Sequence, residues 1–169
     1  MKSKHIFLFF VTIVTLLVYA CQKEGGGNSN LRIRMTDAPT ALEEVNIDLR
    51  QVNIKFAKDS SGWVGMQTNA GIYNLLDFQN GVDTLIAQGT YPQGDVKEIR
   101  LVLGNNNSVK ESGQVYPLII PSGSESGLKI KINKKLRTGL DSLLIDFDAL
   151  MSIKKERDNY KLRPVIKLK

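Results

Sequence analysis

The chain has 169 residues, a net charge of +6, one histidine and one cysteine. The histidine, His5, lies ahead of the cysteine, Cys21. A mature chain that begins at Cys21 therefore contains no histidine, which excludes Ser-His-Asp and Cys-His nucleophilic machinery and zinc sites built from His and Cys. Loss of Lys2 and Lys4 leaves 21 basic and 17 acidic residues, a net charge of +4, which is lower than nucleic-acid binders usually carry.

The first 20 residues have the pattern of a bacterial lipoprotein signal. A basic start, residues 1–5, precedes an apolar run of 13 residues, 6–18, which is shorter than the roughly 20 residues of a spanning helix. We expect cleavage before Cys21 and attachment of diacylglycerol to its thiol, because two or more acyl chains hold a protein stably on a membrane. Ordinary signal cleavage after Ala20, which leaves Cys21 as a free thiol, is the alternative.

The segment that follows is rich in Gly, Asn and Ser. Residues 21–30 are predicted to form the lipidated start and a flexible tether, because such a composition leaves the backbone many conformations. Residues 31–169 have the usual size of one domain, and a single cysteine forms no internal disulfide, so we expect one domain held by its core alone.

Apolar residues recur with period two along the rest of the chain, which predicts half-buried strands. The predicted strands cover residues 31–35, 45–56, 63–67, 72–78, 82–88, 96–103, 115–120, 128–133, 143–148 and 160–168. A switch of parity within 45–56 predicts a bulge near Arg50 and Gln51. Short strands separated by turn signals, without a long helical pattern, predict an all-β fold, an antiparallel β-sandwich.

Several motifs, in this order, resemble one known family. They are Met35-Thr36-Asp37-Ala38-Pro39, Val45-Asn46-Ile47-Asp48, Gly71-Ile72-Tyr73-Asn74-Leu75-Leu76-Asp77, Asn80-Gly81, Pro92-Gln93-Gly94, Ile99-Arg100-Leu101-Val102-Leu103-Gly104, Gly127-Leu128-Lys129, Asp146-Phe147-Asp148-Ala149 and Leu162-Arg163-Pro164-Val165-Ile166. Over residues 31–169 the chain resembles the domain of unknown function 4382. The resemblance implies an immunoglobulin-like or transthyretin-like sandwich in exported lipoproteins of the Bacteroidota, anchored at the outer membrane and facing the periplasm or the outside. It implies no reaction.

Two carboxylates, Asp146 and Asp148, lie two positions apart on one predicted strand and should share a face. Such a pair suits acid/base chemistry or the binding of Ca²⁺. The alternative is that both are solvated or paired with outward lysines of a neighbouring strand, such as Lys129 and Lys131.

Lys129 and Lys131 belong to a larger set of outward basic residues on three predicted strands. The others are Lys134, Lys161, Arg163, Lys167, Lys169, Arg32 and Arg34. If those strands are neighbours, the set forms one basic face that suits anionic glycan or lipid headgroups. Outward lysines also keep sheet edges from pairing with other chains, which is the alternative.

Polar loops and aromatic side chains complete the candidate ligand-binding residues. Asp37 and Asn106 lie in loops at strand ends, where sandwiches often bind ligands, although Asp37 is equally suited to cap its own turn. Trp63 directly follows a predicted turn and would stack on a sugar ring if exposed, whereas a core position is the alternative. The other aromatic candidates are Tyr73, Tyr91 and Tyr116.

The function that we predict is a non-catalytic, lipid-anchored binding or adhesion module of the cell envelope. Its partners would be the membrane, through Cys21, and a glycan or an envelope protein. The alternatives are a glycan hydrolase that uses Asp37, Asp146 or Asp148, and a structural subunit of an outer-membrane assembly. We expect no cofactor, no metal site and no nucleic-acid partner.

Overall fold

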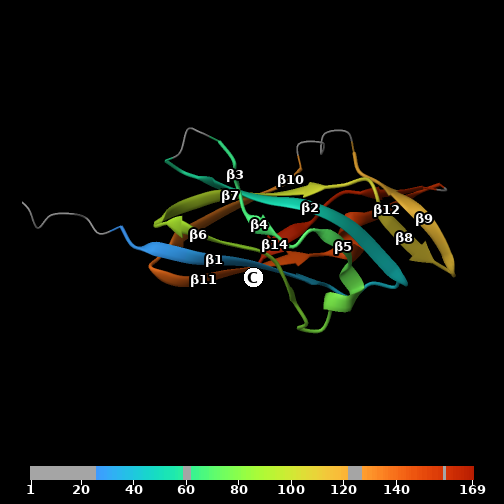
Figure 1. Ribbon diagram of the computed structural model, residues 1–169. Helices are drawn as coiled ribbons and strands as arrows, with labels where there is room; N and C mark the ends of the chain where they lie inside the picture. The colour runs from blue at the N-terminus through green and yellow to red at the C-terminus, as the bar shows by residue number, and fades with distance from the viewer. Residues whose placement is uncertain (1–25, 59–61, 122–126, 158) are drawn as a thin grey trace, which may run out of the picture.

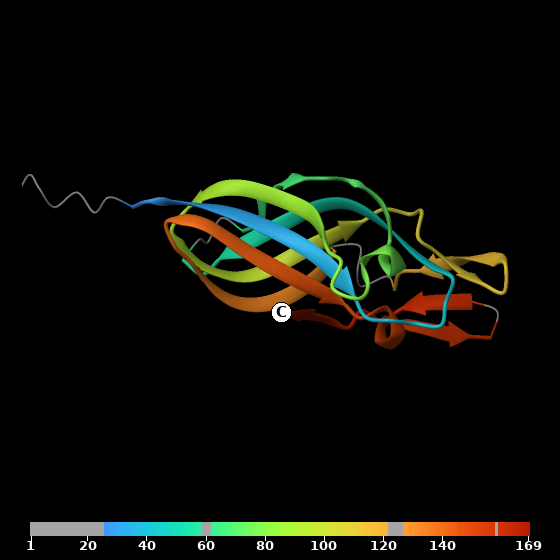
Figure 2. The same ribbon diagram turned by 90° about the horizontal axis from the view of Figure 1, so that it is seen from below.

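Two open, mixed β-sheets pack against each other in a sandwich-like β fold, seen from two sides in Figures 1 and 2. The computed structural model describes residues 26–58, 62–121, 127–157 and 159–169. The predicted signal, Cys21 and the start of the predicted tether lie outside the described residues. Among those described, no helix has the length and apolar character needed to cross a membrane.

The first sheet has the strand order β14-β11-β1-β6-β4. Its strands are β1 (Asn28–Asp37), β4 (Gln67–Thr68), β6 (Thr84–Pro92), β11 (Gly139–Phe147) and β14 (Ile166–Leu168). Alternate side chains of a strand point to the same face, and Leu31 and Ile33 of β1 and Ile145 of β11 are all fully buried. The inner face of this sheet forms one half of the core.

The second sheet has the order β10-β7-β2-β8-β9-β13-β12, and β3 and β5 also pair with β2. Its strands are β2 (Glu44–Phe56), β3 (Val64–Gly65), β5 (Gly71–Asn74), β7 (Gly94–Leu103), β8 (Ser108–Glu111), β9 (Gln114–Ile119), β10 (Leu128–Leu136), β12 (Ile153–Glu156) and β13 (Asn159–Leu162). Val52 and Ile54 of β2 and Ile99 of β7 are fully buried, so this sheet supplies the other half of the core.

Several sequence predictions are confirmed. The pairing of β2 with β7 shifts between Leu49 and Gln51, where the parity switch predicted a bulge. Strand β3 pairs antiparallel with the end of β2, as expected for the predicted strands 45–56 and 63–67 with a turn between them, although residues 59–61 lie outside the described residues. Strand β6 begins at Thr84, within the predicted strand 82–88.

The expected antiparallel arrangement is wrong in two places: β13 pairs parallel with β9 in the second sheet, and a longer parallel pairing lies at the centre of the first. Strands β1 and β11 run parallel, with Ser29 opposite Gly139 and Asp37 opposite Phe147. The turn after Leu136 joins β10 of the second sheet to β11 of the first, so the chain changes sheet and enters beside β1 in the same direction. Alternation with period two is the same in parallel and antiparallel strands, so the sequence pattern contained no sign of this.

Two predicted strands are each only partly correct. Residues 72–78 divide into β5 and a 3-10 helix, η1 (Leu75–Phe78), because the Asn74 side chain accepts a hydrogen bond from the Leu76 N–H and caps the turn. Residues 160–168 divide into β13 and β14, which lie in different sheets. Pro164, which has no N–H to donate to a ladder, lies in the break.

The predicted tether is too long at its C-terminal end. Asn28, Ser29 and Asn30 are part of β1; all three pair with β6, and Ser29 and Asn30 also pair with β11. Ser29 is fully buried, and its hydroxyl donates a hydrogen bond to Asp141 Oδ2 at 3.1 Å. Strand pairing satisfies these polar residues, which the composition alone assigned to a flexible segment.

Candidate functional site: a groove at the start of β1

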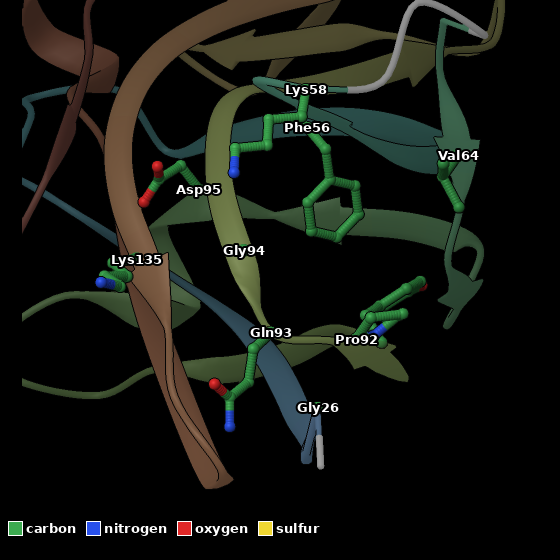
Figure 3. Close-up of a pocket in the computed structure, with 10 residues that line it drawn as sticks. Gly26, Phe56, Lys58, Val64, Pro92, Gln93, Gly94, Asp95 and Lys135 are labelled. Atoms are coloured by element: carbon green, nitrogen blue, oxygen red, sulfur yellow. The ribbon is translucent and has the colours of Figure 1, made fainter. Parts of the chain in front are cut away.

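A groove opens at the end of the sandwich where β1 begins (Figure 3). Its volume of about 800 Å³ lies within the range of known small-molecule sites. The lining comes from the end of β2, from β3, from the turn between β6 and β7, and from β10. Segments that are far apart in the sequence therefore build it.

One part of the lining is apolar. Phe56, Val64, Tyr91 and Pro92 supply this part. The rings of Phe56 and Tyr91 are tilted by 54° with their centroids 6.1 Å apart, a favourable arrangement for an aromatic pair. The Tyr91 hydroxyl donates to the Gly65 carbonyl oxygen at 3.3 Å, which ties the ring to β3. Gly89 leaves room for this ring, because a Cβ there would lie 2.5 Å from the Tyr91 hydroxyl oxygen.

The other part of the lining is polar and charged. Lys58, Gln93, Asp95 and Lys135 supply it. Asp95 on β7 is the cross-strand partner of Lys135 on β10, and Asp95 also accepts at its backbone oxygen from the Ala57 N–H at 2.8 Å. Among the described residues, no ion pair includes Lys58, Asp95 or Lys135. Their charges are therefore available to a ligand.

Asp37 lies at the opposite end of β1 and is only 3% exposed. Its Oδ1 accepts from the Ala149 N–H at 2.8 Å and its Oδ2 from the Gln79 side-chain amide at 3.4 Å. Burial raises the pKa of Asp37 to about 6, against the lowering effect of these hydrogen bonds, and the nearby charge of Asp146 raises it further. Asp37 thus joins β1 to the segment after β11.

Asp146 and Asp148 do not form the expected pair of carboxylates on one strand, because β11 ends at Phe147. Asp146 is 8% exposed and forms an ion pair with Lys169 at 2.9 Å. Its Oδ1 is buried and has no hydrogen-bond partner in the described part of the chain. Asp148 accepts from the Met151 N–H at 3.0 Å and caps helix α2 (Ala149–Ser152).

Trp63, Lys129 and Lys131 lie together on the outer face of the second sheet. The Arg100 guanidinium carbon lies 4.6 Å from the centroid of the Trp63 ring, so Trp63 is a half-buried platform for cations rather than a core residue. Lys129 is the cross-strand partner of Arg100, and Lys131 is the partner of Glu98. The expected alternative partners of Asp146 and Asp148, Lys129 and Lys131, belong to the other sheet and pair with neither.

The larger predicted basic set does not form one face. Its strands are divided between the sheets, since β1 and β14 lie in the first and β10 and β13 in the second. Several members also pair with carboxylates of their own surroundings. These pairs are Arg34 with Asp83, Lys134 with Asp141, Lys161 and Arg163 with Glu156, and Lys169 with Asp146.

Asn106 lies in a loop that the protein itself holds in place. Its backbone N–H donates to Asp48 Oδ2 at 3.1 Å, and Asp48 is almost fully buried. Asn107 Oδ1 accepts from the Asp48 N–H at 2.9 Å, so the two segments are joined twice. The Asn106 side chain itself remains exposed.

The carboxylates, the Trp63 group and Asn106 therefore fall in three separate places, and Tyr91 is the one sequence candidate that lines the groove. Sequence reasoning missed the groove, although it included Tyr91 among the aromatic candidates. Among the other groove residues, Lys58 begins one predicted turn, 58–62, and Gln93 and Gly94 belong to another, 91–94, and a turn alone does not indicate a binding site. In the described residues, no three acidic, histidine or cysteine side chains come together as a metal site.

Comparison with known protein families extends over nearly all of the described strands. The family described as "Domain of unknown function (DUF4382)" matches residues 28–164. The chain belongs to this family. The DUF4382 match includes every groove residue from Phe56 to Lys135 and ends before β14 and Lys169. No curated protein and no solved structure matches the chain.

Proposed function

We propose that the protein is a non-catalytic binding module of the cell envelope, which holds a glycan in the groove at the start of β1. The groove supports this proposal because its two parts match the two parts of a sugar. The C–H face of a sugar ring packs on aromatic and apolar side chains such as Phe56 and Tyr91, and its hydroxyl groups hydrogen-bond to polar side chains such as Gln93 and Asp95.

We also propose that Cys21 carries a lipid and that the protein is an exported lipoprotein of the Bacteroidota type at the outer membrane. Strand β1 begins at Asn28, seven residues after Cys21. At about 3.6 Å per residue these span at most about 25 Å, so the groove would open close to the lipid headgroups. An immunoglobulin-like or transthyretin-like subtype remains our proposal for the sandwich, on the basis of its two packed sheets.

Binding is better supported than hydrolysis because the carboxylates that a hydrolase would use have structural partners. Asp37 accepts from a backbone N–H, Asp146 pairs with Lys169, and Asp148 caps α2. A partner protein is the other ligand that we propose for the groove, since a protein side chain would use the same apolar and charged surfaces.

A glycan array with residues 22–169, prepared without the lipid, tests the proposal. We expect saturable binding of one glycan class and at least tenfold weaker binding by Tyr91→Ala, since stacking on the groove is lost. Tyr116→Ala removes a half-buried tyrosine outside the groove and is the matched control. If no glycan binds, or if both variants bind as the unchanged protein does, the groove is not a glycan site. Release of sugar products by the unchanged protein would instead favour the hydrolase.

Fractionation of cells tests the anchor. Cys21→Ser should move the protein from the membrane to the soluble fraction, because the acyl chains have no other attachment. Persistence of the variant in the membrane fraction would contradict the lipoprotein assignment. Protease treatment of intact cells then separates a surface-facing domain, which is released, from a periplasmic one, which is protected.

A further inference from the structure

The outer face of the second sheet carries a group of cations that the groove does not use. We call this group the basic face; it consists of Lys55 on β2, Lys97 and Arg100 on β7, and Lys129 and Lys131 on β10. Lys129 lies opposite Arg100 in the β-ladder, and Lys131 and Lys55 lie on either side of Glu98. The Lys97 ammonium donates a hydrogen bond to Asn133 Oδ1 at 3.0 Å, which places Lys97 beside β10.

Trp63 organises two of these cations. The Arg100 guanidinium lies 4.6 Å and the Lys55 ammonium 6.0 Å from the ring centroid. Gly127 packs against the aliphatic part of the Arg100 side chain, since a Cβ at position 127 would lie 2.7 Å from Arg100 Cγ. Cation–π contacts of this kind position a positive charge without neutralising it. The two cations are therefore ordered and still charged.

The basic face lacks the ion pairs that occur elsewhere in the molecule. Within the described residues, carboxylates pair with Arg34, Lys110, Lys134 and Lys155, among others, but with no member of the basic face. Glu98 is the one acid between Lys55 and Lys131 in the ladder, and it forms no ion pair with either within the described parts. Like charges directly opposite each other, such as Arg100 and Lys129, destabilise a sheet. Stability alone therefore does not explain this arrangement.

Protection of a sheet edge does not explain it either. Lysines on an edge strand discourage pairing with other chains, and β10 is such a strand. However, β7 pairs with both β10 and β2, and Ile54 of β2 pairs with both Ile99 and Val64. Lys55, Lys97 and Arg100 thus lie on interior strands, which have no free edge to protect.

We propose that the basic face binds a linear anionic polysaccharide, one that carries sulfate or carboxylate groups. Strand geometry places Lys129 and Lys131 about 6.6 Å apart along β10 and Arg100 about 5 Å from Lys129 across the ladder, while Lys55 lies one strand further on, so the cations extend over three strands rather than forming a single point of charge. An extended polymer with regularly spaced anions complements such an arrangement. The strongly exposed large apolar side chains of the described residues, among them Ile72 on β5, Val115 on β9 and Leu150 on α2, lie on elements other than β2, β7 and β10, so this face offers charge rather than an exposed apolar surface for lipid.

The test uses residues 22–169 with heparin as the sulfated probe and polygalacturonate as the carboxylate probe. Trp63 is the only tryptophan of the chain, so its fluorescence reports directly on the basic face. We expect a saturable, salt-sensitive change on addition of either probe, because exposed charges are screened by salt. The double variant Lys55→Glu, Lys131→Glu should bind at least about thirtyfold more weakly, since each removed charge contributes about a fivefold factor near an anionic partner.

The matched control is the double variant Lys154→Glu, Lys167→Glu. It has the same net charge but changes exposed lysines that lie on β12 and β14. The control should bind as the unchanged protein does, and Lys129→Ala should lie between the two if the folded state of each variant is confirmed by circular dichroism. If both double variants bind the probes equally weakly, the loss of binding follows from net charge alone and not from the basic face, and the proposal is overturned.

Two further outcomes separate this surface from its alternatives. Tyr91→Ala, which alters the groove, should leave binding of heparin and polygalacturonate unchanged. The proposals for the basic face and for the groove can therefore fail separately. Binding to vesicles of phosphatidylglycerol and phosphatidylcholine without binding to either polysaccharide would overturn the proposal in favour of a membrane surface.

Discussion

The two ends of the sandwich use charged residues in opposite ways. At the end where β1 begins, Lys58, Asp95 and Lys135 surround a groove and form no ion pair among the described residues. At the end where β1 stops, Asp37 and Asp146 are buried, one against a backbone N–H and the other against Lys169. Charges at the far end maintain the fold, whereas charges around the groove are available for binding.

Substitution of one phenylalanine at each end tests this difference most strongly. Phe147→Ala should lower the free energy of unfolding by about 3–5 kcal/mol, because Phe147 is fully buried and its loss leaves a cavity. Phe56→Ala should cost about 1–2 kcal/mol, because the half-buried ring at the groove loses less buried area. Denaturant unfolding of both variants measures the two values. Equal losses would mean that the groove end is packed as tightly as the far end.

The pH dependence of stability sharpens the comparison at the far end. Between the ordinary pKa of 3.8 and the folded value of about 6, the folded protein retains a proton on Asp37 that the unfolded chain has released. The contribution of Asp37 to stability is therefore complete below pH 3.8 and falls by about 3 kcal/mol as the pH rises from 3.8 through 6. Asp37→Asn should remove this fall.

Unfolding free energies of the unchanged protein and of Asp37→Asn, measured from pH 4 to 8, provide the check. The difference between the two curves isolates Asp37 from the other carboxylates, which titrate in both proteins. Parallel curves across this interval would show that Asp37 has an ordinary pKa.

The smallest change in stability is expected at the groove rim. Lys58→Ala combined with Lys135→Ala should alter the free energy of unfolding by no more than about 0.5 kcal/mol, because surface side chains without partners contribute little. The same variant should weaken binding of any ligand that the groove holds. Titration of the ligand from the glycan array measures that loss. A large loss of stability with unchanged affinity for the ligand would contradict this assignment, because the lysines of the groove would then maintain the fold and not bind the ligand.

Local patterns predicted most of the strands, and even the bulge beside Arg50, because alternation depends only on which side chains of a strand face the core. They also predicted the family, since its motifs lie along one continuous segment. They failed where a residue's environment comes from another part of the chain. Asp148 follows the alternation of β11, yet it lies beyond the strand and caps a helix that the pattern did not reveal.

The candidate site shows the same limit. Trp63 and Lys129 were predicted separately, and the pairing of β2, β7 and β10 brings them to one face with Arg100, which no local signal indicated. The groove residues come from five segments, including Gly26 ahead of β1, that meet only after both sheets have formed. Only one of them, Tyr91, was a candidate from the sequence, and only as one aromatic among several.

By itself the sequence determined the strand content, the exclusion of histidine chemistry from a chain that begins at Cys21, and the membership of a family. These follow from composition and from short-range periodicity. The tertiary structure alone decided that β1 and β11 run parallel, that Asp37 is buried, and that the available charges gather around the groove and on the outer face of the second sheet. The physical reason is that burial, strand pairing and charge neutralisation are properties of contacts between residues far apart in the chain, which periodicity along the chain does not encode.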